Sequence, residues 1–398
     1  MKRCFIICFL AALAALYPAV CWTADSNTTS KGKMDDGALS AIERLLLSKG
    51  IFRIAPDKAI VLFSGQGYFW TCFDKSEAVS YSPENVLWGL PIQEVILRFS
   101  GDHLSEVRLS LYNRVNVGDR SSGQIQQILS RLTNSMELIG KANYRDKLIF
   151  NEKGHRWVES VWANDSTHFR LIFGTSKIGW SKTRPEFVTM VVTPVKFESE
   201  PMKVITSKSR GRQPNTNGNG DVWLNVPMVI KPDPGLCGPA SLERILKCKA
   251  VDVDKFQIAD LAETKNKKEG TTMANLLAAA KLLAGFLKGK VSVLQDWNSS
   301  LAEDVITRYK STPGPASKDE AEIPQSGDIA EIYAVMNKDR FLRAQKPTEA
   351  ARHKFMTGVQ SKIDQGHPLC WSLVVGMVSE SPPSEKGVFW PYASHTGL

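Results

Sequence analysis

Short apolar runs separated by turn residues dominate residues 50–206. The runs predict strands at 59–63, 68–73, 95–99, 107–112, 156–163, 169–173 and 187–193. Hairpin turns are expected at 65–67, 101–102 and 164–166. One helix interrupts these strands, because apolar residues recur every three or four positions at Ile125, Ile128, Leu129, Leu132, Met136 and Ile139. The pattern therefore predicts an α+β domain with antiparallel strands, whose role the sequence does not reveal.

The pattern is mostly helical from residue 223 onward. Helices are predicted at 242–249, from Asp252 as cap to 262, from Thr271 or Thr272 as cap to 287, near 329–336 and at 347–363. Gly366 is a stop signal for the last of these helices. A short strand is expected at 291–294, and the nearly continuous apolar run 368–375 predicts a strand that is buried on both faces.

Two polar segments divide the chain. Residues 25–49 are mostly polar and end in a short predicted helix at 39–47, whereas residues 207–222 are rich in Gly, Asn, Ser and basic residues. The second segment reads as an interdomain linker between a domain at 50–206 and another at 223–398. The chain is thus expected to have two domains.

The N-terminus has the pattern of a secretory signal peptide. Lys2 and Arg3 precede an apolar run from Phe5 to Leu16, and small residues follow. Cleavage after Cys21 or after Ala24 fits, so residues 1–24 are taken as the signal. Val20 and Pro18 do not favour lipoprotein anchoring at Cys21. The run is shorter than the ~20 apolar residues of a spanning helix, so a secreted or periplasmic protein with no integral membrane segment after signal removal is expected.

Composition and charge exclude several classes of protein. The 398 residues are 43% hydrophobic and 23% charged, which is ordinary for a globular protein. The net charge of +9 is spread thinly, with no long basic block, so nucleic acid is not an expected partner. Seven cysteines, three of them before residue 22, are too few for a dense disulfide framework. The sequence implies no metal and no organic cofactor.

The segment Gly235-Leu236-Cys237-Gly238-Pro239-Ala240-Ser241-Leu242 carries the clearest chemistry. A cysteine stands at the start of a predicted helix, and Pro239 suits a first helical turn. The helix dipole and the unpaired N–H groups there favour a thiolate and can hold an oxyanion. A buried helix-end cysteine or half of a disulfide remains the alternative until a base is found.

Two histidines are candidate bases. His395 follows small residues after the buried strand, and His367 lies at the turn before that strand. The other histidines, His103, His155, His168 and His353, are more simply surface or satisfied polar residues. A general base near Cys237 would complete a thiol nucleophile.

The region 223–398 resembles the papain-like cysteine peptidases related to the bacteriocin leader-processing family. The resemblance rests on Cys237-Gly238-Pro239-Ala240, on 251–262 with 270–272, and on the stretch 363–372 before His395. It implies a papain-like fold, no cofactor, a peptide or protein substrate, Cys237 as nucleophile and His395 as general base. It says nothing about residues 25–206.

The sequence departs from that family at two places. Lys231 stands where the family has an oxyanion-binding Gln, and the printed chain ends three residues after His395. The third catalytic residue, an Asp or Asn, is therefore expected beyond Leu398, in which case the peptidase domain at 223–398 is incomplete. The sequence thus favours a secreted cysteine peptidase, with a catalytically inactive peptidase-like binding module as the alternative.

Overall fold

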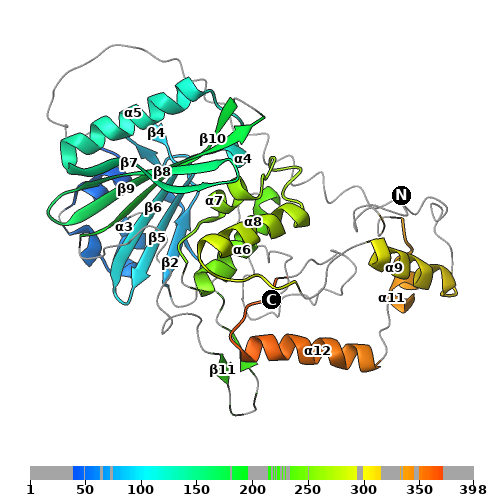
Figure 1. Ribbon diagram of the computed structural model, residues 1–398. Helices are drawn as coiled ribbons and strands as arrows, with labels where there is room; N and C mark the ends of the chain where they lie inside the picture. Colours follow the sequence, from blue (N-terminus) through cyan, green and yellow to red (C-terminus); the bar gives the residue numbers. More distant parts are fainter. Residues whose placement is uncertain are drawn as a thin grey trace, which may run out of the picture. The chain divides into compact units, whose positions relative to one another are not determined.

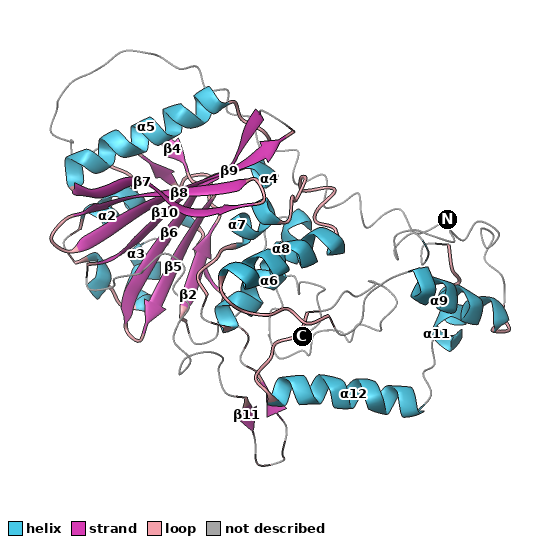
Figure 2. Ribbon diagram, in the orientation of Figure 1, coloured by secondary structure: helices cyan, strands magenta, loops and turns pink. Residues whose placement is uncertain are grey.

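The computed structural model describes residues 39–48, 50–62, 66–71, 75–179, 182–195, 214–216, 218, 220, 222–224, 226, 229, 234–249, 251–293, 299–314, 332, 335–344 and 349–370. These residues have a mixed α+β architecture (Figures 1 and 2), which confirms the predicted fold class at that level. The predicted signal peptide, most of the predicted linker and the segment that contains His395 lie outside them. The papain-like identity of the C-terminal part stays a prediction.

An antiparallel sheet is the largest element of the described residues. Its eight strands lie in the order β1-β2-β5-β6-β10-β9-β8-β7. They are β1 (Phe69–Trp70), β2 (Glu77–Ser80), β5 (Glu94–Ser100), β6 (His103–Asn113), β7 (Lys141–Glu152), β8 (His155–Ala163), β9 (Thr167–Ile178) and β10 (Lys182–Pro194). Ser100 pairs with His103, so Gly101-Asp102 forms the predicted two-residue turn, with Gly101 at φ 60°.

The sheet confirms five of the predicted strands in full and a sixth, 68–73, in part as β1, whereas one prediction is wrong. Residues 59–63 were expected to form a strand, but helix α3 (Pro56–Leu62) covers them as far as residue 62. Pro56 suits the first helical position, and a short apolar run fits either structure. The sequence pattern missed β7, because its twelve residues are mostly exposed and show little alternation.

One face of the sheet packs against α2 (Ala41–Leu47), the 3₁₀ turn η2 (Ile51–Arg53) and α5 (Ser122–Ile139). Ser121 is the N-cap of the 18-residue helix α5 and forms a capping box with Gln124. The apolar stripe of α5 is buried, and it joins side chains of β6, β9 and β10 in one core. Figure 1 shows α5 lying across the sheet.

The other face packs against α6 (Cys237–Cys248), α7 (Lys255–Leu261) and α8 (Met273–Phe286). Their buried side chains form one apolar cluster with Phe150, Trp157 and Phe187 of the sheet. Gly174 lies beneath the Phe187 ring, where an added Cβ would stand 2.1 Å from that ring. The strands of the sheet end at Pro194, and the helices on this face begin at Cys237. The two parts of the chain therefore share a hydrophobic core.

The remaining described elements are smaller. They are β3 (Val86–Leu87) paired with β4 (Leu90–Pro91), β11 (Asn215–Thr216) paired with β12 (Val222–Trp223), α4 (Arg114–Val117), α9 (Ser299–Ser311), α11 (Lys338–Ala344) and α12 (Glu349–Asp364). The β11–β12 pair lies in and next to the predicted linker, so part of that segment is ordered as a hairpin. Helices α9 and α11 share a small apolar cluster of their own.

The C-terminal predictions have mixed outcomes. Helix α12 ends as expected, since Gly366 has φ 70° and the N–H groups of Gly366 and His367 bond to the carbonyls of Ile363 and Lys362. Residues 291–293 have no regular structure, so the strand expected there is wrong as far as it is described. Residues 368–370 are also irregular, and the rest of the run to 375 lies outside the described residues.

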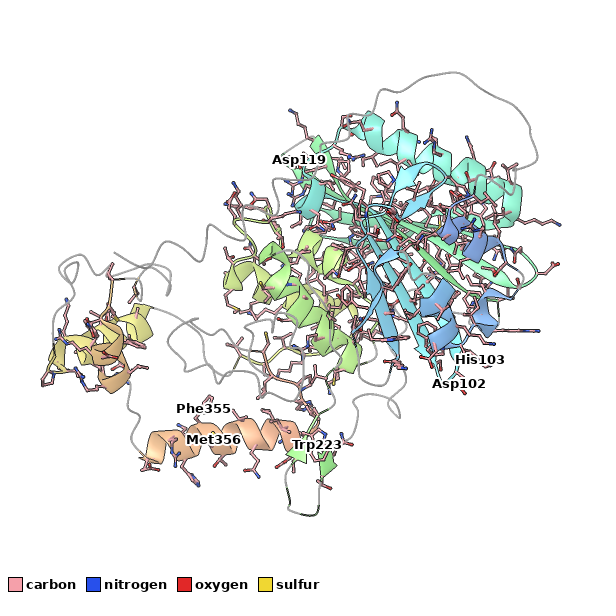
Figure 3. All side chains as sticks on the ribbon, turned by 180° about the vertical axis from the view of Figure 1, so that it is seen from behind. Asp102, His103, Asp119, Trp223, Phe355 and Met356 are labelled. Atoms are coloured by element: carbon pink, nitrogen blue, oxygen red, sulfur yellow. The ribbon has the colours of Figure 1, made fainter. Side chains whose placement is uncertain are left out.

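Two further features concern the surface. Phe355 and Met356 of α12 and Trp223 of β12 are exposed apolar side chains, and Figure 3 labels all three. Within the described ranges, no helix combines the length and the apolar character that a membrane crossing requires.

Candidate active site around Cys237

Cys237 begins α6, as the sequence predicted. The 3₁₀ turn η4 (Pro234–Leu236) precedes it, and no side chain caps the helix. Leu236 is fully buried and anchors the turn, whereas Cys237 is partly exposed and forms no disulfide. The thiol therefore stands at a helix N-terminus, where the backbone dipoles favour negative charge.

Two glycines allow neighbouring segments to approach Cys237 closely. A Cβ on Gly235 would lie 2.6 Å from the carbonyl oxygen of Asn266, so only a glycine leaves room for that backbone. A Cβ on Gly238 would lie 3.2 Å from the Leu276 side chain at the start of α8. The spacing Gly-x-Cys-Gly thus places the cysteine between the loop 264–271 and α8.

The loop 264–271 is itself held rigidly. The Asn266 side-chain oxygen accepts hydrogen bonds from the N–H groups of Lys268 and Glu269, and the hydroxyls of Thr264 and Thr271 are 2.6 Å apart. The guanidinium of Arg114 donates to the carbonyl oxygens of Thr264 and Lys265 at 2.5 and 2.7 Å. The loop that supports Gly235 is therefore tied to the sheet side of the molecule.

Arg114 is held in turn by a buried carboxylate. Its Nε lies 2.7 Å from Glu186 of β10, and both side chains are buried. Glu186 also accepts from the Ser176 hydroxyl and pairs with Arg184. Polar contacts thus run from β10 through Arg114 to the loop 264–271, and the Asn266 carbonyl of this loop lies close against Gly235, two residues before Cys237.

A second set of ion pairs joins the sheet to α7. Arg108 of β6 contacts Asp254 and Asp252 at 3.2 and 2.5 Å, and it also contacts Glu106. Asp254 accepts from the N–H groups of Phe256 and Gln257, so it is the cap of α7. The prediction that Asp252 caps this helix is wrong, since Asp252 pairs with the arginines of the sheet.

A third set joins the sheet to α6. Lys247 contacts Glu77 of β2 at 3.0 Å and Glu243 at 3.2 Å. Although burial works in the opposite direction, Lys247 and Arg98 lower the pKa of Glu77 to about 2. The buried ammonium of Lys255 pairs with Glu94 of β5, and its backbone N–H donates to Glu243. These contacts fix the orientation of the helix that begins with Cys237.

His155 is a satisfied buried residue, as predicted. Its Nδ1 lies 2.7 Å from Asp260 of α7, and the indole N–H of Trp157 donates to the other carboxylate oxygen at 2.7 Å. Burial disfavours the imidazolium, but Asp260 raises the pKa of His155 against that effect. The pair is a link between β8 and α7.

The structure does not bring the second candidate base to Cys237. His367 follows Gly366, whose carbonyl accepts from Lys249 just after α6 ends. Since α6 has twelve residues, its two ends lie about 18 Å apart, and His367 belongs to the end opposite Cys237. Partial desolvation and the charges of Lys249 and Lys362 lower the pKa of His367.

The other predicted site residues are the proposed base and the oxyanion candidate. His395 and Lys231 lie outside the described residues. All described strands of the large sheet precede Cys237 in the chain. Residues 371–398, where the resemblance expects the strand that carries the histidine, are outside the described part.

Sequence reasoning missed the residues that hold the cysteine in place. Arg114, Arg108 and Glu186 lie in strand-like or turn-like segments, and no motif marks them, because their partners are 70 to 150 residues away in the chain. Among the described residues, no group of three or more His, Cys, Asp or Glu side chains could hold a metal ion.

Comparisons with known proteins give no family assignment. No family model, no curated protein and no solved structure matches this chain.

Proposed function

We propose that the chain is a secreted cysteine peptidase that hydrolyses peptide bonds through Cys237. The observation that carries the proposal is the position of this partly exposed, disulfide-free thiol at the first residue of α6. Its flanking glycines allow two other segments to support it at close range. A thiolate at such a helix start, with backbone N–H groups beside it, has the elements of a nucleophile and an oxyanion site.

In the proposed reaction the Cys237 sulfur attacks the carbonyl carbon of the scissile peptide. His395 removes the thiol proton and later gives it to the leaving amine, so the C–N bond breaks and an acyl-enzyme remains. Water then cleaves the thioester and regenerates the thiol. Lys231 is proposed as a donor to the oxyanion in place of an amide side chain.

The test is labelling with a biotin-tagged epoxysuccinyl peptide, which alkylates activated peptidase thiols. We expect labelling of the full-length protein that is lost in Cys237→Ala and kept in Cys370→Ala. Cys370 is an exposed thiol, so this control separates activation from mere access. Equal labelling of the native protein and Cys237→Ala would overturn the assignment.

Turnover distinguishes a peptidase from an inactive binding module. Cleavage of a pool of quenched fluorescent peptides should fall by at least ~10³-fold in Cys237→Ala. If peptides bind equally to both proteins and neither cleaves them, the chain is a binding module on a peptidase scaffold. Lys231 is the sequence feature that favours this alternative.

A further inference from the structure

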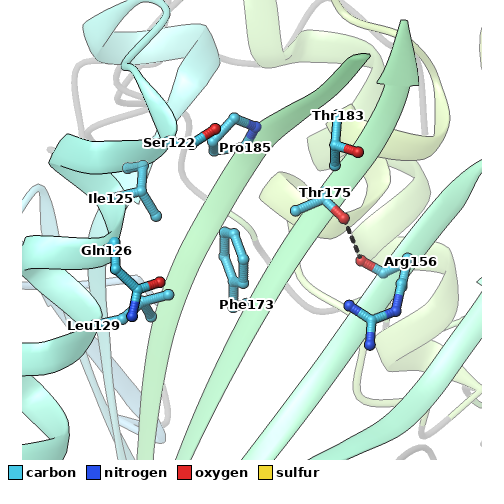
Figure 4. A pocket seen from close by; sticks show the side chains of 9 residues that line it. All are labelled: Ser122, Ile125, Gln126, Leu129, Arg156, Phe173, Thr175, Thr183 and Pro185. Atoms are coloured by element: carbon cyan, nitrogen blue, oxygen red, sulfur yellow. Dashed lines mark hydrogen bonds between the residues drawn. The ribbon is translucent and has the colours of Figure 1, made fainter. Parts of the chain in front are cut away.

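A pocket of about 290 Å³ lies between α5 and the ends of β8, β9 and β10, on the face of the sheet opposite α6–α8. Figure 4 shows the ring of Phe173 between the side chains of α5 and Arg156. Ile125, Leu129 and Pro185 complete an apolar lining. The volume is at the low end of ligand sites, so the pocket suits one apolar side chain with its backbone groups.

The polar lining of this pocket selects for an anion. Among the described residues that line it, Arg156 is the charged one and none is acidic. The carbonyl of Arg156 accepts from Thr175, but its exposed guanidinium has no hydrogen-bond or ion-pair partner among the described residues. Lys177 projects from the same face of β9 as Thr175, two residues further on, but it does not line the pocket. A guanidinium fork of this kind matches a carboxylate.

Uncharged hydrogen-bonding groups surround the same pocket. The amide of Gln126 and the hydroxyls of Ser122 and Thr183 line it beside the apolar residues. These groups can form hydrogen bonds with the N–H and C=O groups of a peptide. A plain hydrocarbon chain offers them no hydrogen-bond partner. The combination is therefore typical of a site for a peptide end rather than for an acyl chain.

We propose that this pocket binds the C-terminal carboxylate of a peptide whose last residue is apolar. The carboxylate pairs with Arg156, and the last side chain packs on Phe173 and Leu129. The site lies on the face of the sheet opposite the helices that hold Cys237 and does not depend on the activity proposed for that residue. It would hold a partner or substrate by its end.

The experiment is fluorescence anisotropy with a labelled pentapeptide that ends in Ala-Leu, as the free acid and as the amide. The full-length Cys237→Ala protein is used, so that no cleavage can occur. We expect a Kd on the order of 10⁻⁴ M for the acid and at least tenfold weaker binding of the amide. Octanoate should compete poorly. Equal binding of acid and amide, equal competition by octanoate, or no binding of the acid up to about 5 mM would each overturn the proposal.

Two matched pairs of variants locate the site. Arg156→Gln should weaken acid binding at least tenfold, whereas Lys182→Gln, which removes an exposed charge from the opposite face of β10, should not. Gln126→Trp should fill the pocket and block binding, whereas Gln127→Trp places the same ring on the next exposed position of α5. All four positions are exposed, so we expect all four variants to fold. Equal effects within either pair would contradict this location.

Discussion

The two faces of the eight-stranded sheet are covered in different ways. On the α5 face the contacts of the core are apolar, with Leu132 and Met136 fully buried against strand side chains. On the α6–α8 face an apolar cluster is accompanied by buried ion pairs, centred on Arg108 and Arg114. Apolar packing is thus the main contact between the sheet and α5. Between the sheet and α6–α8, apolar packing is combined with ion pairs of fixed geometry.

The difference concerns geometry more than total stability. Apolar burial is non-directional and tolerates substitutions that conserve volume. A guanidinium that contacts two or three partners at fixed positions fixes orientation, although buried ion pairs add little net stability because of their desolvation. The ionic face is the face that carries α6 and Cys237. We infer that its charges position the cysteine.

The largest expected effect is on the ionic face. Arg108→Met removes the cation that Asp252 and Asp254 share and leaves the buried Asp254 carboxylate uncompensated, so the free energy of unfolding should fall by about 3–5 kcal/mol. The matched change on the other face, Leu132→Met, should cost less than about 1.5 kcal/mol. Urea denaturation followed by circular dichroism measures both. Equal losses would remove the distinction between the faces.

A smaller effect is expected where the ionic face meets the site. Gly235→Ala forces a Cβ against the Asn266 carbonyl, so the loop 264–271 or the start of α6 must shift, at a cost of about 1–3 kcal/mol. The rate of Cys237 labelling should fall several-fold. Gly285→Ala is the control, since its Cβ meets open space within α8. An unchanged labelling rate in Gly235→Ala would show that this loop does not position the thiol.

A third expected effect is a pH dependence of stability. The pKa of Glu77 is lowered to about 2 in the folded protein, so the folded state favours the carboxylate. Its contribution is therefore complete above the unfolded pKa near 4.5 and is lost as the pH falls toward 2. The native protein should lose stability over this range more steeply than Glu77→Gln, as measured by urea midpoints at each pH. Parallel curves would show that Lys247 and Arg98 do not stabilise the charged form.

Local patterns were sufficient for much of the secondary structure. The apolar period of α5, the two-residue turn at Gly101-Asp102 and the Gly366 stop were read correctly, because each depends on neighbours within one or two turns. The apolar run at 59–63 was misread, since four or five apolar residues fit a helix as well as a strand. Strand β7 was missed because its exposed residues carry no alternation.

In the candidate site, too, local sequence patterns predicted some features, and tertiary contacts decided the others. The sequence by itself determined that Cys237 begins a helix between two glycines, because capping and backbone freedom are local properties. Only the tertiary structure decided what those glycines touch, that Arg114 and Arg108 hold the surrounding loop and helix, and that His367 lies at the far end of α6. These contacts join residues that are far apart in the chain, and no local pattern encodes such pairs.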